Sequence, residues 1–387
     1  MKRPQSGKYT IISTVGGEPC KAFIPNPLPP QPELQIDVKM QTLLDEALLS
    51  LGRLDSISTL LPDTQLFIYM YVRKEAVLSS QIEGTQSSLS DLLKHEGDVK
   101  KGVPVADIRE VSNYVSALEH GLQRLREGFP ISLRLIRELH GILLQSGRGS
   151  FKDPGEFRKS QNWIGGTRPG NAVYVPPPPD ELIHCLSDFE AFLHDKPTRL
   201  PVLIKIALAH VQFESIHPFL DGNGRVGRLL ITLLLCWMGV LCDPTLYLSL
   251  YFKTNRSEYY DLLQNVRVNG EWEKWLKFFL KGVVETANSA IQTAKSLVEI
   301  FEKDRQKIQA IGLSAGSALR VHHALQQFPI SRLNKLAQMT KLSYPTVKHA
   351  VEKLVELKLV SEVTGLKRGK LYCYDQYLNI LNEGTQL

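Results

Sequence analysis

Residues 217–228 read HPFLDGNGRVGR, and they lie between a helix-patterned apolar stretch at 202–215 and a second, strongly apolar one at 226–238. The two glycines on either side of Asn223 let successive backbone N–H groups converge on one point. The helix expected after them adds the positive end of its dipole, so an anion would be stabilised from two sources. This stretch therefore predicts a polyphosphate site at a loop between two core helices.

The side chains of the same stretch suit chemistry on a bound phosphate. Arg225 and Arg228 are three residues apart, hence on one helix face, where both guanidinium groups could engage further phosphate oxygens. Asp221 is the only carboxylate in the loop, and an oxygen ligand beside phosphates is what Mg²⁺ prefers. His217 changes protonation near neutral pH, so it is the candidate general base for an attacking hydroxyl.

With these residues at fixed spacing, the stretch resembles the signature of Fic-domain proteins, H-P-F-x-D/E-G-N-G-R-x-x-R, at every fixed position. The resemblance implies an enzyme that uses ATP and Mg²⁺ to attach AMP to a hydroxyl side chain of a target protein. It implies His217 as the base and Asp221 as the metal ligand. The alternative is a glycine-rich turn with helix-capping polar residues and no ligand. The implied nucleotide-binding residues of the loop are Gly222, Asn223, Gly224, Arg225, Val226, Gly227 and Arg228.

A second motif lies upstream, where residues 79–84 read SSQIEG. This resembles the inhibitory pattern of the same family, S/T-x-x-x-E-G/N, in the class whose inhibition is intramolecular and N-terminal to the catalytic loop. Glu83 projecting into the anion site would pair with Arg228 and remove the positive group that a γ-phosphate needs. Taken alone, the six residues fit a polar last helical turn with a glycine stop equally well. The implied inhibitory residues are Ser79, Glu83 and Gly84.

Two further segments correspond to family features. The β-prone segment 162–176 occupies the place of a flap that adds a strand to an extended target, with Ile164, Gly165 and Gly166 as its core. Segment 256–260, RSEYY, resembles the adenine-side segment of the family, which implies adenine contacts from Tyr259 and Tyr260. Packing of these tyrosines in the core is the alternative.

Helical periodicity covers most of the chain outside the glycine- and proline-rich region 147–179. The predicted fold is mostly α: a Fic-type helical domain with a small β-hairpin flap, followed by a C-terminal winged helix domain. The expected helices are 37–54, 62–84, 105–125, 132–145, 180–194, 202–215, 226–238, 258–267 and a long one to about residue 300. The expected domains are an N-terminal segment 1–104 with a proline-rich arm and the inhibitory helix, a catalytic domain 105–300 and a winged helix-turn-helix-like domain 312–387.

The C-terminal region suggests helices at 318–328, 332–339 and 344–357, followed by two short strands around a GLKRG turn. This order resembles a winged helix-turn-helix with its recognition helix at 343–357. Lys367, Arg368 and Lys370 on the turn could contact phosphate, which leaves DNA binding through 343–370 open. Glu352 and Glu356 on the helix favour the alternative, a protein-docking or homodimer surface.

The composition bears on the partners of the protein and on its cellular compartment. A net charge of +6 over 387 residues is too small to indicate nucleic-acid binding by itself. Five scattered cysteines fit a reducing compartment, and no signal peptide is expected. The longest apolar stretch, 229–242, falls short of the roughly 20 residues that span a bilayer. We therefore expect a cytoplasmic protein with no membrane partner.

The leading hypothesis is a protein adenylyltransferase, a nucleotidyltransferase that moves AMP from ATP to a Tyr, Thr or Ser hydroxyl of target proteins and of itself. It would release pyrophosphate and be autoinhibited by Glu83. One alternative is an ATP-sensing transcription regulator acting through the winged helix, although a sensor needs no base such as His217. The other is removal of AMP from modified targets, with Glu83 orienting a water molecule.

Overall fold

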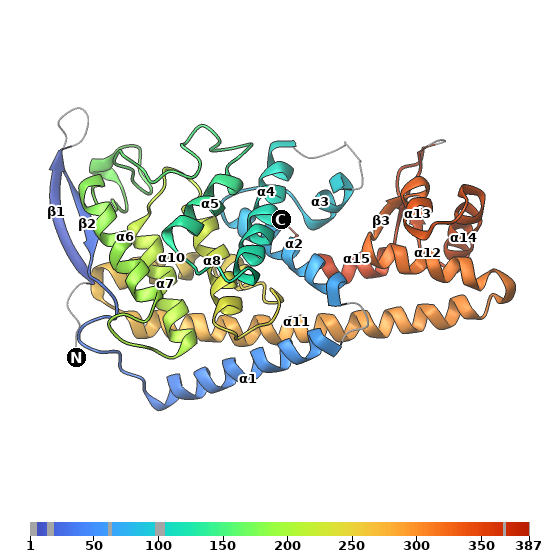
Figure 1. Cartoon of the computed structure of the whole chain (residues 1–387), viewed down its shortest axis with the longest axis horizontal. Helices are drawn as coiled ribbons and strands as arrows, with labels where there is room; N and C mark the ends of the chain where they lie inside the picture. The colour runs from blue at the N-terminus through green and yellow to red at the C-terminus, as the bar shows by residue number, and fades with distance from the viewer. Residues whose placement is uncertain (1–5, 14–18, 61–63, 97–104, 367–368, 387) are drawn as a thin grey trace.

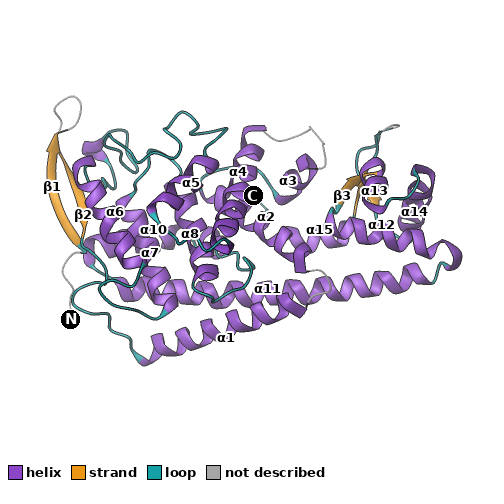
Figure 2. Ribbon diagram, viewed as in Figure 1, coloured by secondary structure: helices purple, strands orange, loops and turns teal. Residues whose placement is uncertain are grey.

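The computed structural model describes residues 6–13, 19–60, 64–96, 105–366 and 369–386. Helices make up most of this part, and regular strands occur only near its two ends (Figure 2). The prediction of a mostly α fold is confirmed. No helix within the described ranges combines the length and the apolar character that a membrane crossing requires.

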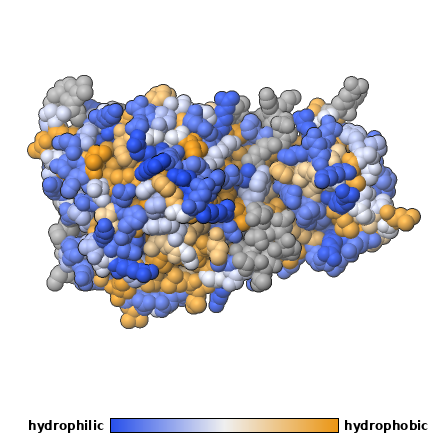
Figure 3. Space-filling view, in the orientation of Figure 1, coloured by the Kyte–Doolittle hydropathy of each residue, from blue (hydrophilic) through white to orange (hydrophobic). Residues whose placement is uncertain are grey.

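Two long helices run side by side along the molecule (Figure 1). They are α1, Val38–Leu60, and α11, Trp272–Gln309, and both extend further than the predicted ends near residues 54 and 300. The charged stretch after residue 300 stays helical because Ile300 and Ile308 are buried and Asp304 accepts a hydrogen bond from the Tyr374 hydroxyl. On the face shown in Figure 3, apolar residues gather where α1 runs, and α1 exposes Leu48 and Leu49.

The helices of the body surround α7, in which every residue from Leu203 to Ile216 is buried. Helix α5 begins as predicted, because the Ser132 side chain accepts the Leu135 N–H. The other helices of the body pack around α7 and α8 or connect the helices that do. Their bounds are α2 Thr64–Ile82, α3 Leu89–Glu96, α4 Val105–Arg126, α5 Leu133–Leu143, α6 Pro179–Leu193, α7 Val202–Ile216, α8 Asn223–Trp237, α9 Ser249–Thr254 and α10 Arg256–Asn269.

An antiparallel hairpin precedes the helices. Its strands are β1, Gly7–Ser13, and β2, Pro19–Pro25, and β2 reaches the body where the Phe23 N–H donates to the Val175 carbonyl at 2.8 Å. This hairpin was not predicted from the sequence. The predicted flap, in contrast, contains a single antiparallel bridge, between Ile164 and Tyr174, in place of two regular strands.

The C-terminal module, residues 312–386, contains a three-stranded antiparallel sheet in the order β3-β5-β4. The order of its elements fits the predicted winged helix, which stays a prediction, and the predicted recognition helix corresponds to α14. Lys348 and Lys353 on α14 pair with Glu352 and Glu356, so its charge is partly neutralised. Lys367 and Arg368 lie outside the described residues. The elements are α12 Ala315–Gln327, β3 Ile330–Arg332, α13 Leu333–Thr340, α14 Tyr344–Glu356, β4 Ser361–Glu362, β5 Leu371–Cys373 and α15 Asp375–Asn382.

Candidate active site

The predicted loop joins the ends of two buried helices. Helix α7 ends at His217, whose backbone has φ 49° and ψ 60°, and α8 begins after Gly222, which has φ 79°. A left-handed conformation is uncommon for a non-glycine residue and persists where the surroundings enforce it. The amides of Asn223, Gly224 and Arg225 form the first turn of α8, where N–H groups have no acceptor within the helix. The loop therefore connects His217 to the first-turn amides that the sequence predicts to bind an anion.

The amide of Asn223 closes the loop from inside. Its Oδ1 accepts the Phe219 N–H at 2.9 Å, and its Nδ2 donates to the Phe219 carbonyl at 2.8 Å. Asn162 donates to the same carbonyl at 2.9 Å. The side chain of Asn223 thus shapes the loop, while its backbone N–H remains part of the anion-binding turn.

His140 on α5 also holds the loop, and the sequence analysis gave it no role. Its Nδ1 accepts the Gly155 N–H at 2.8 Å, so the ring proton is on Nε2, which donates to the Asp221 carbonyl at 3.0 Å. The ring stacks on Phe219 with centroids 3.7 Å apart. Burial lowers the pKa of His140 to about 4, so the ring is neutral at physiological pH.

We expect His140→Phe to lower the free energy of unfolding by about 1–3 kcal/mol at pH 7.5, measured by urea denaturation. Phenylalanine keeps the stack on Phe219 but leaves the Asp221 carbonyl and the Gly155 N–H without His140. His194→Phe is the control, because His194 is exposed and donates only to the Ile131 carbonyl. Equal losses in the two variants would contradict the positioning role.

The contribution of His140 to the free energy of unfolding depends on pH. The pKa of His140 is depressed in the folded state, so the unfolded chain binds the extra proton below about pH 6.5. Wild-type protein therefore loses stability from this group as the pH falls from about 6.5 to 4. We expect the difference between wild type and His140→Phe to narrow over this range.

Arg158 fixes the backbone around His217 from the other side, and it too was missed. It is 3% exposed. Its Nε donates to the His217 carbonyl at 2.9 Å and its NH2 to the Pro177 carbonyl at 2.5 Å. Burial lowers the pKa of Arg158 to about 10, which still leaves it charged at neutral pH. It is a positioning residue that also places a positive charge near the imidazole.

This environment keeps His217 unprotonated. Burial is the largest cause that lowers the pKa of His217 to about 3, and the charges of Arg267 and Arg158 lower it further. A neutral imidazole can accept a proton, as a general base must. In the ligand-free protein we expect the ¹⁵N resonances of His217 to show a neutral ring down to about pH 4. A protonation midpoint above pH 6 would contradict this environment.

The two arginines of the motif point to different partners. Arg225 is 1% exposed and pairs with Glu110 of α4 at 2.8 Å and with Asp221 at 3.3 Å. Both partners of Arg225 are carboxylates, and its contact with a phosphate stays a prediction. Glu110, which also pairs with Arg148 at 3.1 Å, had not been singled out, because nothing near it in sequence marks it.

Arg228 contacts the end of α2. Its Nε donates to Ser79 Oγ at 2.9 Å and its NH2 to the Ser79 carbonyl at 3.0 Å and to Glu83 Oε1 at 2.6 Å. Burial would raise the pKa of Glu83, but Arg228 outweighs it and holds that pKa below the usual value. A Cβ on Gly224 would lie 2.3 Å from Glu83 Oε1. The carboxylate thus lies directly on the glycine loop, and Gly84, with φ 94°, ends the helix as predicted.

Asp221 fits the predicted magnesium ligand in its chemistry. Its Oδ1 accepts the Gly222 N–H at 2.6 Å and pairs with Arg225, while a Cβ on Gly149 would lie 2.9 Å from Oδ2. Within the described ranges no group of three or more His, Cys, Asp or Glu residues could hold a metal. One carboxylate is what Mg²⁺ needs where phosphates and water supply its other ligands.

The predicted adenine-side tyrosines differ from each other. Tyr259 is 1% exposed, its ring stacks on Phe252 at 4.6 Å, and its hydroxyl lies 2.8 Å from His210 Nε2. Tyr260 is 41% exposed, which leaves it the more accessible of the two. Arg267, later on the same helix, donates to the Glu214 carbonyl at 3.1 Å. The adenine contacts stay a prediction.

The core of the predicted flap is half-buried at Ile164 and exposed at the two glycines. Gly165 and Gly166 have φ 68° and 69°, and a Cβ on Gly166 would lie 2.4 Å from the Asn171 carbonyl oxygen. Glycine is therefore required for this turn. The docking of a target at this segment stays a prediction.

Comparisons with known proteins find similarity over the part of the chain that contains this loop. Residues 41–123 match the family described as Fic/DOC family N-terminal, and residues 130–235 match the Fic/DOC family. Protein adenylyltransferase Fic of Aedes aegypti is 37% identical over 210 residues, which are 49% of this chain and 38% of that protein. The protein of the same name in Drosophila grimshawi is 33% identical over 164 residues, 42% of this chain and 31% of that protein. The matched region spans about a third of these relatives.

Solved structures show the same fold. A Fic family protein from Desulfovibrio desulfuricans G20 has a TM-score of 0.58 at 21% identity, covering 89% of this chain and 98% of that one. Residues 134–508 of Fic-1 from C. elegans give a TM-score of 0.51 at 22% identity, covering 68% and 73%. The prediction of a Fic-type helical domain is therefore confirmed. With its motif, its fold and both family matches, the chain is similar to Fic/DOC family proteins over residues 41–123 and 130–235, and it is distantly similar to protein adenylyltransferase Fic.

Proposed function

We propose that this protein is an adenylyltransferase that transfers AMP from ATP to a hydroxyl side chain of a target protein, and to itself, with release of pyrophosphate. The observation that carries the proposal is the loop itself. It joins His217, whose imidazole is neutral, to the first turn of α8, and Arg228 lies further along the same helix. The identity to proteins named adenylyltransferases supports the same reaction class.

In the proposed reaction, the target hydroxyl oxygen forms a bond to the α-phosphorus as the bond to the pyrophosphate oxygen breaks. His217 takes the hydroxyl proton, and the pyrophosphate leaves. The amides of Asn223, Gly224 and Arg225 would bind phosphate oxygens and stabilise charge in the transition state. Asp221 would hold Mg²⁺, which when bound neutralises phosphate charge. Asn223, His140 and Arg158 keep these groups in place through the loop backbone.

In this proposal, the Glu83 side chain hinders the binding of ATP phosphates at the loop. Its carboxylate takes the Arg228 guanidinium and lies on Gly224, within the space where the phosphates would bind. We propose that this contact is autoinhibitory and that ATP binds productively only after α2 releases Glu83. Basal activity should therefore be low.

Labelled ATP tests the reaction class. Purified Glu83→Gly protein, incubated with Mg²⁺ and cell extract, should acquire label from [α-³²P]ATP and none from [γ-³²P]ATP, and mass spectrometry should find AMP on the protein. Label from the γ-phosphate, or no adduct at all, would contradict adenylylation. Loss of AMP from a modified target without added ATP would instead support the removal reaction, and ATP-dependent DNA retention without label would support a regulator.

A further inference from the structure

The segment after α15 returns from the C-terminal module to the helix that carries Glu83. Helix α15 packs against α11, α3 and α2, and the chain beyond it, residues 382–386, lies against the end of α2. Figure 1 shows the chain returning after α15 toward α2. Thr385 is 1% exposed, so this segment is a packed part of the fold.

A direct contact joins the segment to the last turn of α2. Gln81, two residues before Glu83, donates from Nε2 to the Thr385 carbonyl at 2.9 Å and to the Ser87 carbonyl at 2.9 Å. Gln81 is 8% exposed, so both hydrogen bonds are shielded from water. One side chain therefore connects the inhibitory turn, the loop after it and segment 382–386.

Two further contacts hold the segment from other helices. Lys253 of α9 donates from Nζ to the Gln386 carbonyl at 2.5 Å and lies 3.5 Å from the Gly384 carbonyl. Asn382 donates to Ser90 Oγ, at the start of α3, at 2.7 Å. The position of the segment is thus defined independently of its contact with Gln81.

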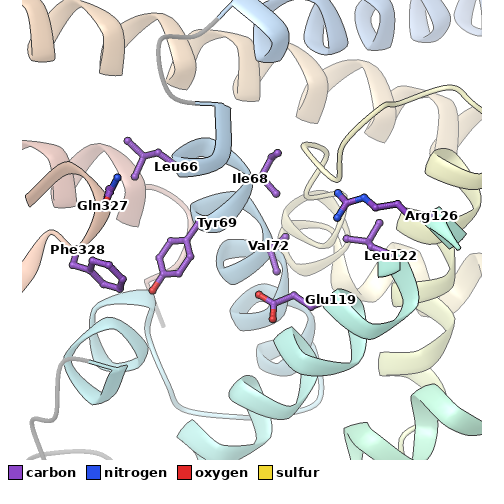
Figure 4. A pocket seen from close by; sticks show the side chains of 9 residues that line it. All are labelled: Leu66, Ile68, Tyr69, Val72, Glu119, Leu122, Arg126, Gln327 and Phe328. Carbon is purple, nitrogen blue, oxygen red and sulfur yellow. The ribbon is translucent and has the colours of Figure 1, made fainter. Parts of the chain in front are cut away.

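The C-terminal module also touches the opposite end of α2. The Tyr69 ring of α2 packs edge-on against Phe328, just after α12, with centroids 5.7 Å apart. Figure 4 shows both rings at a cavity of about 370 Å³ that α2, α4 and the end of α12 line. A displacement of the module would therefore act on α2 near both ends.

We propose that segment 382–386 is a latch that holds the last turn of α2, and with it Glu83, against Arg228. Release of the latch frees Glu83, so the C-terminal module controls the nucleotide site. This regulation rests on the proposed function. This regulation requires no structural change in the catalytic loop 217–228, because the latch acts only on α2, whose Glu83 blocks that loop.

Gly384→Val is designed to open the latch, and it lies outside the catalytic loop 217–228. Gly384 has φ 80°, and a Cβ there would lie 2.6 Å from Leu250 Cδ1 of α9. The matched control is Gly312→Val, because Gly312 has φ 78° and nothing within 4 Å of its Cβ position. Both variants have the backbone strain, and only the first also crowds the side chain of Leu250 against the segment. Lys253→Met is a milder second variant, which removes the Nζ contacts.

Amide hydrogen exchange of the full chain gives the first readout. In Gly384→Val, peptides covering residues 79–86 should exchange roughly tenfold faster than in Gly312→Val, with Lys253→Met in between. Peptides from α7 and α8 should be unchanged. Equal exchange of residues 79–86 in all these proteins would overturn the latch.

AMP incorporation gives the second readout. Gly384→Val should raise it several-fold over Gly312→Val when Glu83 is present, and should add nothing in a Glu83→Gly background. The same increase in both backgrounds, or none in either, would overturn control through Glu83. If Glu83→Gly itself yields no AMP product, the proposed function is wrong, and the exchange result still decides whether the latch holds α2.

Discussion

Replacing His217 is expected to lower the rate of AMP transfer by a factor of about 10² to 10⁴, the usual contribution of a positioned general base. The imidazole is neutral and belongs to the loop whose amides would bind the phosphates, so its removal takes away the proposed proton acceptor. The rate should be measured as label incorporated from [α-³²P]ATP in the Glu83→Gly background, where blockage by Glu83 does not limit it.

The residue that replaces His217 determines whether the loss of transfer can be assigned to the missing base. Because His217 has φ 49°, alanine would add backbone strain to the loss of the base, whereas asparagine tolerates this conformation. His217→Asn should therefore keep the loop and the affinity for ATP, measured by calorimetry, while transfer is lost. Full transfer activity in His217→Asn would rule out this residue as the base.

Replacing Glu83 by glycine is expected to raise AMP incorporation several-fold and to tighten ATP binding. The substitution frees the Arg228 guanidinium and clears the carboxylate from Gly224. Arg228 keeps Ser79 Oγ and the Ser79 carbonyl as acceptors, so the protein should remain folded. Unchanged product formation would contradict autoinhibition.

Glu83→Gln is the matched control for the charge. Glutamine has the size of glutamate and can still accept a hydrogen bond from Arg228, but it has no charge to oppose a γ-phosphate. Its effect should therefore lie between wild type and Glu83→Gly. An effect equal to that of Glu83→Gly would show that charge alone, and not occupation of the loop, causes the inhibition.

Most of the longer helices of the body could be predicted because apolar residues recur along them at helical spacing. The expected helix 105–125 is α4, Val105–Arg126, and 202–215 is α7, Val202–Ile216. The β1–β2 hairpin was missed because its position depends on packing against Val175, far along the chain. Helix α11 continues beyond residue 300 because Asp304 is buried under Tyr374, a contact that local charge pattern does not reveal.

The site was predictable where one continuous motif carries it. The loop from His217 to Arg228 and the segment at Glu83 could be found from spacing, and the structure brings Glu83 and Arg228 together. The residues that hold the loop could not be found in this way. His140 and Arg158 reach it from 81 and 59 residues away, and an isolated histidine or arginine in a sequence carries no such signal.

Because α11 is continuous, a truncation inside it is expected to destabilise the resulting fragments. The helix crosses the boundary expected between residues 300 and 312, and its last turns bury Asp304 and Ile308 against the C-terminal elements. A fragment that stops at residue 300 would leave the partners of those turns open to water and prone to aggregate. The catalytic body and the module behind it are therefore expected to melt in one cooperative transition, and dissecting them at this boundary should yield insoluble pieces.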